Sequence, residues 1–242
     1  MRELEGRTIV LTGACGGIGA VVARMAAERG ARLLLIDLDA ARLDGLLASL
    51  PGAGHAKAVS SLDTPGACAE ALRAIEGPLY GLVHMAGIYV PHDLGPAGRE
   101  VYDRTLAANT TNGFDLVGAM LDRLTTDEPA RLVFASSQAF RRGSIGHVAY
   151  SVAKGGIAGL VRALSRNLAP GALVNGLAPG LIDTPMPAHV LASRGADMLR
   201  DIPLGRIGRP EEVAGVVMFL LGPLSTYVNG QIINVDGGVH NA

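Results

Sequence analysis

Residues 8–19 read Thr8-Ile9-Val10-Leu11-Thr12-Gly13-Ala14-Cys15-Gly16-Gly17-Ile18-Gly19. The first five residues form an apolar run typical of a buried strand, and a stretch with helical periodicity begins at Ile18. Glycines between a strand and a helix let the backbone approach a pyrophosphate, which the N–H groups at the helix N-terminus can bind. The stretch therefore predicts a dinucleotide-binding turn. A tight turn that binds no ligand is the alternative.

The same strand–turn–helix order repeats along the chain. Strand-like runs occupy residues 8–12, 32–36, 56–59, 81–84, 131–135, 173–177 and 231–235, and helical stretches occupy 18–29, 40–49, 65–75, 98–124, 149–168 and 210–220. Apolar strands that alternate with helices form parallel sheets covered on both faces. We therefore expect an α/β protein, a single-domain Rossmann fold over residues 1–242 with a doubly wound seven-stranded parallel sheet. Scattered Pro, His and Gly predict a flap near a ligand at residues 183–209.

The composition excludes several classes of partner. The net charge of the 242 residues is −1 and there is no basic block, which argues against nucleic acid and anionic membranes. No apolar run approaches the roughly 20 residues of a membrane span, and the charged N-terminus does not resemble a signal peptide. Cys15 and Cys68 show no metal-ligand spacing and suggest no disulfide. A cytoplasmic protein without a metal site is expected.

The second strand ends at Asp37, about 20 residues after the glycine turn. An acid at this place can accept a hydrogen bond from an adenosine ribose 2′-OH, and it repels a 2′-phosphate. A basic residue beside the acid or within the turn would favour the phosphorylated cofactor, but Leu38 and Gly16 stand there. The sequence thus predicts NAD rather than NADP. Alternatively, Asp37 only caps the helix that begins near Asp39.

Tyr150 and Lys154 form the chemically most informative pair, since Lys57 is the only other lysine. Residues i and i+4 share a helix face, which would place an ammonium near a phenol. Such a charge would lower the tyrosine pKa from its usual value of about 10. Tyr150 could then exchange a proton near neutral pH. An ordinary exposed helix pair is the other interpretation.

With the glycine turn, Asp37 and the Tyr150–Lys154 pair together, the whole chain resembles the short-chain dehydrogenase/reductase family. Further landmarks of this resemblance are Ala135-Ser136-Ser137, Ala108-Asn109-Thr110-Thr111, Asn175-Gly176-Leu177-Ala178-Pro179-Gly180 and Val235-Asp236-Gly237-Gly238.

The resemblance implies a catalytic set of Asn109, Ser137, Tyr150 and Lys154. Tyr150 would exchange the proton with the substrate oxygen, Ser137 would donate a hydrogen bond to it, and Lys154 would hold the nicotinamide ribose. Asn109 would position a water that links Lys154 to solvent. Alternatively, Ser137 only terminates a strand and Asn109 only bonds locally within its helix.

The resemblance also implies the cofactor contacts. Besides Tyr150 and Lys154 they are Gly13, Cys15, Gly16, Gly17, Ile18, Gly19, Asp37, Leu38, Leu62, Asp63, Ala86, Gly87, Pro179, Gly180, Ile182 and Thr184. Ile182 and Thr184 would hold the nicotinamide carboxamide. The adenine contacts are assigned to the Leu62 backbone and to Asp63, because Ser61 stands where the family usually has an aspartate.

A second departure follows the fourth strand, where the family usually has Asn-Asn-Ala-Gly and this chain has His84-Met85-Ala86-Gly87. Met85 cannot supply amide hydrogen bonds, which puts the local tie between sheet and helix in doubt. His84 is interpreted as a core histidine rather than a catalytic base.

Substrate specificity is expected in loops after the strands, at residues 88–93, 138–147 and 186–200. Their mixed polar and apolar side chains suit a small to mid-sized secondary alcohol or ketone. Arg141 and Arg142 could bind a carboxylate or phosphate, although a solvated pair of charges is the plainer interpretation.

The leading hypothesis is therefore an NAD-dependent oxidoreductase that acts on a small polyol, sugar or hydroxy acid. The alternatives are a 3-oxoacyl-[acyl-carrier-protein] reductase that uses NADPH, and a non-catalytic sensor of NAD(H). The resemblance also implies a homotetramer, with contact surfaces at residues 98–124, 149–168 and 225–242. Helices that pack only within one subunit would be the alternative.

Overall fold

The computed structural model describes residues 3–185 and 199–240. They contain one seven-stranded sheet whose strands lie in the order β3-β2-β1-β4-β5-β6-β7. Every neighbouring pair is parallel. The strands are β1 (Thr8–Thr12), β2 (Arg32–Asp37), β3 (Ala56–Val59), β4 (Gly81–His84), β5 (Ala130–Ala135), β6 (Ala172–Pro179) and β7 (Ile232–Val235). The predicted doubly wound parallel sheet is confirmed.

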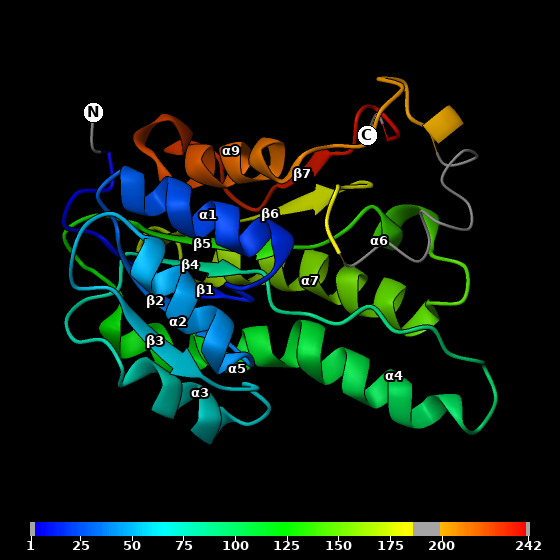
Figure 1. The fold of residues 1–242 in the computed structure, drawn as a ribbon, viewed down its shortest axis with the longest axis horizontal. Coiled ribbons are helices and arrows are strands. Elements are labelled where there is room, and N and C mark those ends of the chain that lie inside the picture. The colour runs from blue at the N-terminus through cyan, green and yellow to red at the C-terminus, as the bar shows by residue number, and fades with distance from the viewer. Residues whose placement is uncertain (1–2, 186–198, 241–242) are drawn as a thin grey trace.

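Side chains that alternate along the strands build two hydrophobic layers. On one face, Ile9 and Leu11 pack with α1 (Gly17–Glu28), α2 (Ala40–Ser49) and α9 (Pro210–Leu221). On the other, Val10 packs with α3 (Pro65–Leu72), α5 (Asn112–Met120) and α7 (Val148–Asn167). Figure 1 shows α1 and α9 on one side of the sheet and α3 and α5 on the other. Because both faces are covered, the strands are apolar throughout rather than alternating in sequence.

The long helix expected at residues 98–124 is not uniform. It consists of α4 (Gly98–Leu106), a π-helical turn η1 (Ala107–Thr111), α5 and a 3-10 turn η2 (Leu121–Arg123). A π-turn inserts an extra residue per turn and shifts the side chains that follow; such turns are frequent at functional sites. Here the π-turn contains Asn109, so it sets the direction of that side chain.

Other element bounds differ from expectation by a few residues. The helix α3 ends at Leu72 rather than at residue 75, and β6 continues to Pro179. The short helix α6 (Ala139–Arg142) and the 3-10 turn η3 (Pro223–Ser225) were not predicted from the sequence. Of the expected flap, residues 186–198 lie outside the described residues, as do residues 241–242 of the expected C-terminal contact surface.

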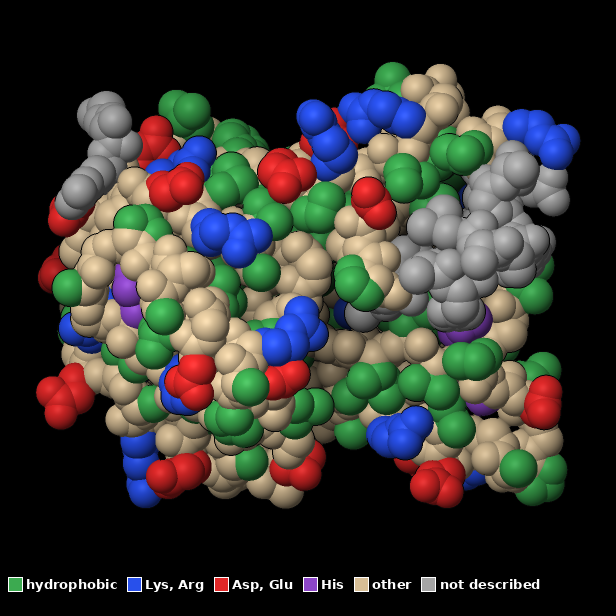
Figure 2. Space-filling view, viewed as in Figure 1, with side chains coloured by type: hydrophobic (Ala, Val, Ile, Leu, Met, Phe, Trp, Pro, Cys, Tyr) green, Lys and Arg blue, Asp and Glu red, His purple; other side chains and the backbone are tan. Residues whose placement is uncertain are grey.

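Two surface properties bear on partners. Among the described residues, no helix is both long and apolar enough to cross a membrane. On the face shown in Figure 2, basic and acidic side chains are interspersed rather than gathered into blocks of one sign.

Candidate active site

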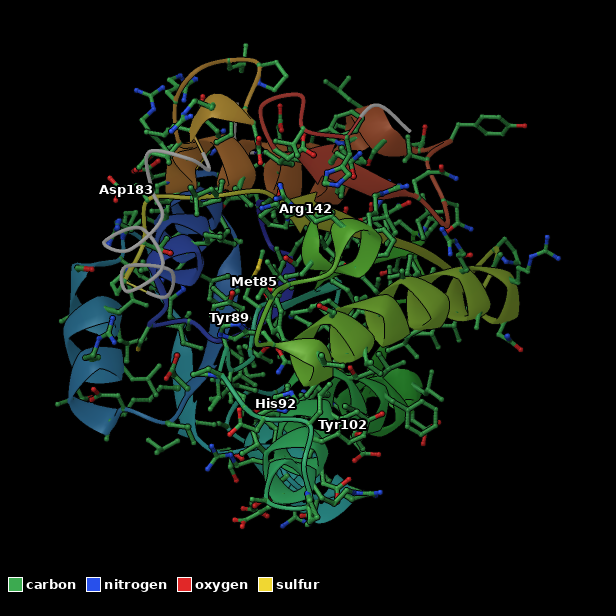
Figure 3. The ribbon with its side chains drawn as sticks, turned by 90° about the vertical axis from the view of Figure 1, so that its right-hand side faces the viewer. Met85, Tyr89, His92, Tyr102, Arg142 and Asp183 are labelled. Carbon is green, nitrogen blue, oxygen red and sulfur yellow. The ribbon has the colours of Figure 1, made fainter. Side chains whose placement is uncertain are left out.

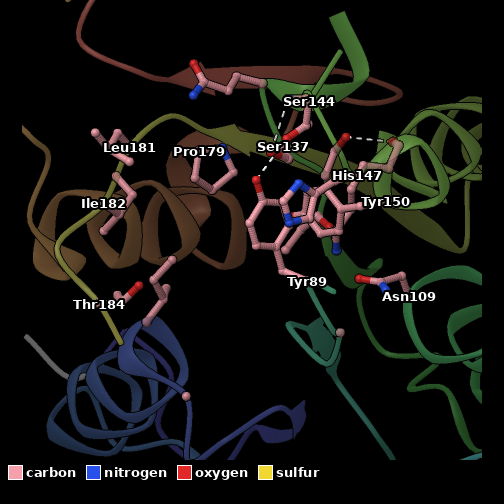
Figure 4. Close-up of a pocket in the computed structure, with 18 of the residues that line it drawn as sticks. Tyr89, Asn109, Ser137, Ser144, His147, Tyr150, Pro179, Leu181, Ile182 and Thr184 are labelled. Carbon is pink, nitrogen blue, oxygen red and sulfur yellow. Dashed lines mark hydrogen bonds between the residues drawn. The ribbon is translucent and has the colours of Figure 1, made fainter. Parts of the chain in front are cut away.

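The carboxyl ends of parallel strands meet at one edge of the sheet, and a cavity opens there. It has a volume of about 500 Å³, within the range typical of small-molecule sites. Its wall contains Gly13, Gly16, Gly17, Ile18, Gly19, Gly87, Asn109, Ser137, Tyr150, Lys154, Pro179, Gly180, Ile182 and Thr184 from the predicted site. Figure 4 shows Pro179, Ile182 and Thr184 on one side of the cavity and Asn109 and Tyr150 on the other.

The glycine turn leaves only backbone at one end of the cavity. Gly13 has a φ of +63°, and a Cβ there would lie 2.8 Å from Ala86 N. A Cβ on Gly19 would overlap the Gly13 carbonyl, and one on Gly17 would lie 2.5 Å from Thr184 Cγ2. Gly16 caps α1 without a side-chain hydrogen bond. The N-terminus of α1 is therefore bare enough to receive a pyrophosphate, and these residues fit a dinucleotide.

Asp37 lies at the adenosine end, at the close of β2. Its carboxylate accepts hydrogen bonds from Cys15 N at 2.8 Å and from Leu38 N at 2.7 Å. Arg42, in the first turn of α2, donates to the Cys15 carbonyl and lines the cavity. Leu38 and Gly16 do stand beside the acid and within the turn, but the sequence analysis did not consider Arg42. The helix brings a side chain five residues past the acid back onto the turn, where only Leu38 and Gly16 had been considered.

The tie between β1 and the segment after β4 does not need the missing amide at Met85. Thr12 Oγ1 accepts hydrogen bonds from Met85 N at 3.2 Å and Ala86 N at 3.1 Å, and contacts His84 Nδ1 at 3.0 Å. His84 is buried and lies outside the cavity wall. Burial, followed by the charge of Lys154, lowers the pKa of His84 to about 3. A neutral core histidine fits these surroundings better than a catalytic base.

Asn109 is fixed by the π-turn and by two backbone carbonyls. Its Nδ2 donates to Ile88 O at 3.0 Å and to Thr105 O at 2.9 Å. Its Oδ1 is buried without a protein partner and faces Gly87, where any Cβ would overlap it. A buried acceptor without a partner requires a donor. Since this oxygen lies at the cavity, a water or a bound group can supply that donor.

Tyr150 and Lys154 lie on one face of α7, as their spacing predicts, but the expected charge effect is absent. Lys154 Nζ lies 5.5 Å from the centre of the Tyr150 ring and donates to Ala135 O at 2.9 Å. Burial raises the pKa of Tyr150 to about 12, while a hydrogen bond with Ser137 acts in the opposite direction. Burial also lowers the pKa of Lys154 to about 8. In this structure burial outweighs any effect of Lys154 on the pKa of Tyr150, and the ammonium is held by the Ala135 carbonyl at the end of β5.

An aromatic wall flanks Tyr150. Tyr89 contacts Tyr150 edge to face with ring centres 4.8 Å apart, and stacks on His147 at 3.8 Å. The Tyr89 hydroxyl lies 2.8 Å from Ser144 Oγ. Figure 4 shows Tyr89 and His147 beside Tyr150. Both lie in loops that the sequence assigns to substrate recognition, and rings packed in this way form a rigid surface.

Gln138 and Arg142, at the two ends of α6, also line the cavity. Gln138 precedes the first turn of α6, and its Oε1 is buried without a protein partner. Arg142 Nη2 lies 3.5 Å from Asp201 Oδ2, and both of these side chains are substantially exposed. Arg142 lines the cavity, whereas Arg141 lies over the ring of Phe140. In Figure 3, Arg142 lies above Met85 and Tyr89.

Not every predicted cofactor residue lies in the cavity wall. Those outside it are Cys15, Asp37, Leu38, Leu62, Asp63 and Ala86. Leu62 has a φ of +54° and a buried side chain, so only its backbone could contact an adenine. The sequence analysis missed Arg42, which the Asp39 cap at the start of α2 could have indicated. Among the described residues, no three His, Cys, Asp or Glu side chains are grouped as metal ligands.

Comparison with known proteins gives consistent results. Residues 13–240 match the family described as enoyl-(acyl carrier protein) reductase. The chain is 32% identical over 239 residues to an acetoacetyl-CoA reductase from Synechocystis sp., covering 98% of both chains. It is 36% identical over 243 residues to a cis-4-hydroxycyclohexanecarboxylate dehydrogenase from Sinomonas cyclohexanicum, covering 96% of both.

Among solved structures, a glucose/ribitol dehydrogenase of the short-chain type from Brucella melitensis superimposes with a TM-score of 0.93. It is 36% identical in sequence, and the match covers 99% of both chains. These similarities extend over nearly the whole sequence. The chain belongs to the short-chain dehydrogenase/reductase family and is an oxidoreductase that acts on CH–OH groups.

Proposed function

We propose that the protein is an NAD-dependent dehydrogenase for small secondary alcohols that catalyses the interconversion of alcohol and ketone. The observation that carries this proposal is one cavity with a bare helix N-terminus at one end and hydrogen-bonded Tyr150 and Ser137 at the other. We assign catalysis to Asn109, Ser137, Tyr150 and Lys154. A bound nicotinamide dinucleotide supplies the hydride acceptor or donor.

Tyr150 is the proton-exchanging group in this proposal. With a pKa raised to about 12 its phenol is protonated at neutral pH, and it can donate to a carbonyl oxygen as reduction proceeds. In the oxidation direction the phenol oxygen accepts the hydroxyl proton of the substrate. Ser137 contacts the same oxygen and stabilises the charge that develops on it. Its own position is fixed by the hydrogen bond that its Oγ accepts from Ala139 N at 3.1 Å.

Lys154 and Asn109 support the proton transfer at Tyr150. Lys154 is buried, and among the residues that the structure describes its ammonium has an acceptor only at Ala135 O, so its remaining N–H groups can reach a ribose or a water. Asn109 Oδ1 is the nearby unpaired acceptor. A water held between these two groups would connect Tyr150 to solvent, as the family resemblance implies. This assignment gives the buried Asn109 oxygen its missing donor.

The preference for NAD rests on Asp37. Its carboxylate closes β2 beside the glycine turn, where it can accept from a ribose 2′-OH and repel a phosphate. Arg42 acts against this preference, since its guanidinium reaches the same turn. However, the arginine is engaged with the Cys15 carbonyl while the carboxylate is fixed by two backbone N–H groups. We therefore propose that NAD is preferred and that Arg42 limits the discrimination.

For the substrate, we propose a small polyol, sugar or hydroxy acid. The relative from Sinomonas cyclohexanicum, which is named for a hydroxy acid, supports this class. The NADPH-dependent 3-oxoacyl-thioester reductase stays the rival, and it is supported by the acetoacetyl-CoA reductase, by the matched family description and by Arg42. A sensor that binds NADH without turnover would not need Tyr150 and Lys154.

The proposed function is tested by following NADH formation with a panel of neutral and acidic secondary alcohols. Wild-type protein is compared with Tyr150→Phe, and with Tyr227→Phe as a control because Tyr227 is fully exposed. We expect the wild-type protein to oxidise an alcohol of the panel. Tyr150→Phe should lose this activity and Tyr227→Phe should keep it. NADH binding without oxidation of any alcohol would support the sensor. Turnover confined to NADPH and 3-oxoacyl thioesters would support the rival.

The homotetramer stays a prediction, as does the cytoplasmic location. Phe114 of α5 and Val152 of α7 are 61% and 45% exposed, which supports a subunit contact on the predicted helices. A monomer found by light scattering would contradict the tetramer.

A further inference from the structure

We propose that Arg142 recognises a carboxylate on the substrate, so that the preferred alcohol is a hydroxy acid with its acid group away from the reacting carbon. This inference rests on the proposed function and narrows its substrate class. Ser137, next to the start of α6, contacts the reacting oxygen in the proposed reaction. Arg142 lies at the other end of this short helix and lines the same cavity.

Helix geometry places two polar groups of α6 on one face. Gln138 and Arg142 are four residues apart, and Arg142 N donates to Gln138 O at 3.2 Å. Residues with this spacing lie about one turn, or 5.4 Å, from one another along the axis. Both side chains line the cavity. A substrate whose reacting carbon lies at Ser137 therefore meets the Gln138 amide first and the Arg142 guanidinium about one turn further on.

The charges of the cavity favour an anion. Among the described residues, its wall contains the cations Arg42, Arg142 and Lys154 and no Asp or Glu. Arg42 lies at the adenosine end and Lys154 lies beside the catalytic tyrosine, so the proposed function already assigns a role to each of them. Arg142 is the remaining cation of the described wall. An arginine fork binds a carboxylate with two parallel hydrogen bonds and thereby fixes its orientation.

The present partner of Arg142 can be exchanged for a ligand. The contact with Asp201 spans 3.5 Å, and the two side chains are 40% and 59% exposed. An ion pair this long and this exposed contributes little stability. A substrate carboxylate that enters the less solvated cavity can therefore compete with Asp201 for the guanidinium.

Gln138 adds a second polar contact. Its buried Oε1 has no protein partner and is an acceptor in the cavity wall. Leaving such an acceptor unpaired costs free energy, and a hydroxyl on the substrate can pair with it. The polar groups of Gln138, at the start of α6, and Arg142, at its end, are thus suited to a hydroxy acid rather than to a purely apolar alcohol.

The test compares 4-hydroxycyclohexanecarboxylate with its primary carboxamide, which has a similar shape and no charge. The ratio of kcat/KM for the two is measured in wild-type protein, in Arg142→Gln and in Arg142→Lys. Arg141→Gln is the matched control, because that neighbour lies on the Phe140 ring and outside the cavity wall. We expect a carboxylate preference of roughly 10- to 100-fold in the wild type. Arg142→Gln should reduce it to near unity, Arg142→Lys should restore part of it, and Arg141→Gln should keep it.

A second variant serves if Arg142→Gln does not fold. Asp201→Asn removes the competing carboxylate, and we expect it to lower KM for the acid and to leave KM for the carboxamide unchanged. Turnover of both compounds without a preference, or a preference that survives in Arg142→Gln, would overturn the proposal while leaving the proposed function intact. If no secondary alcohol is oxidised, both the role of Arg142 and the proposed function are contradicted.

Discussion

The cavity is walled mainly by backbone in the glycine turn after β1, and by side chains beyond β4 and β5. At the first end, Gly13, Gly17 and Gly19 leave no room for a Cβ. At the second end, Tyr89, Tyr150 and Arg142 project from loops and helices that follow different strands. Backbone that presents N–H groups binds a phosphate without regard to the rest of the ligand. Side chains distinguish one substrate from another, so specificity is expected to vary at the second end.

This difference also decides what the sequence could reveal. The turn from Thr12 to Gly19 is contiguous, and its glycines are required by local geometry, so a motif can identify it. The substrate end is assembled from separate segments. Its four-residue helix α6 is too short for a periodic pattern. The Lys154 ammonium donates to the Ala135 carbonyl, 19 positions earlier in the chain, and the four-residue spacing of Tyr150 and Lys154 does not show this contact.

Two further features show what can and cannot be predicted from a single sequence. Thr12 was assigned to the first strand and to the cofactor turn, yet its hydroxyl also holds the segment after β4. The sheet pairs residues that are more than 70 positions apart, which a single sequence does not show. The fold was predictable because seven apolar runs alternate with helices, and such a pattern permits few topologies.

The largest effect is expected at the catalytic tyrosine. Tyr150→Phe removes the proton-exchanging oxygen and keeps the ring that contacts Tyr89, so we expect kcat to fall by about 10²- to 10⁴-fold. The cofactor end should remain intact, with NADH affinity within about threefold of the wild type. Steady-state kinetics and a binding titration on the same preparations check this prediction. Turnover at more than a tenth of the wild-type rate would contradict it.

The next effect concerns Gly87, where the two ends of the cavity meet. In Gly87→Ala the added Cβ would overlap Asn109 Oδ1 and lie 3.4 Å from Lys154 Nζ. We expect lower activity together with a loss of about 1–3 kcal/mol in the free energy of unfolding. Gly95→Ala is the control, because a Cβ at Gly95 meets no atom within 4 Å. Equal unfolding midpoints in denaturant for the two variants would show that Asn109 is not confined as described.

A smaller effect should follow from removing the Thr12 hydroxyl. Thr12→Val leaves the Ala86 N–H without its acceptor, while the Met85 N–H keeps the Thr12 carbonyl, and we expect a cost of about 1–3 kcal/mol of stability. Thr12→Ser keeps the hydroxyl and should lose less. The two variants are compared by denaturant unfolding. If Thr12→Ser is as unstable as Thr12→Val, the methyl group rather than the hydroxyl holds this segment.

The last effect, which vanishes at neutral pH, is a dependence of stability on pH through His84. Its pKa is about 3 in the folded protein and 6.5 in the unfolded chain, so between these values only the unfolded chain is protonated. Acidification from pH 6.5 towards 3 therefore lowers the free energy of unfolding, and above pH 6.5 this group contributes no pH dependence. In His84→Asn the slope should be shallower in that window. Parallel stability–pH curves for the two proteins would contradict the assignment.

The central claim is that the Asp37 carboxylate beside the glycine turn selects NAD over NADP. A titration tests this claim most directly. NADH and NADPH are added side by side to wild-type protein, Asp37→Ser and Arg42→Met, and the fluorescence of the reduced nicotinamide is followed. The chain contains no tryptophan that would complicate the signal. We predict tighter NADH binding in the wild type, a shift towards NADPH in Asp37→Ser, and stronger discrimination in Arg42→Met. Tighter NADPH binding by the wild type would contradict the account and make the acyl-thioester reductase the better assignment.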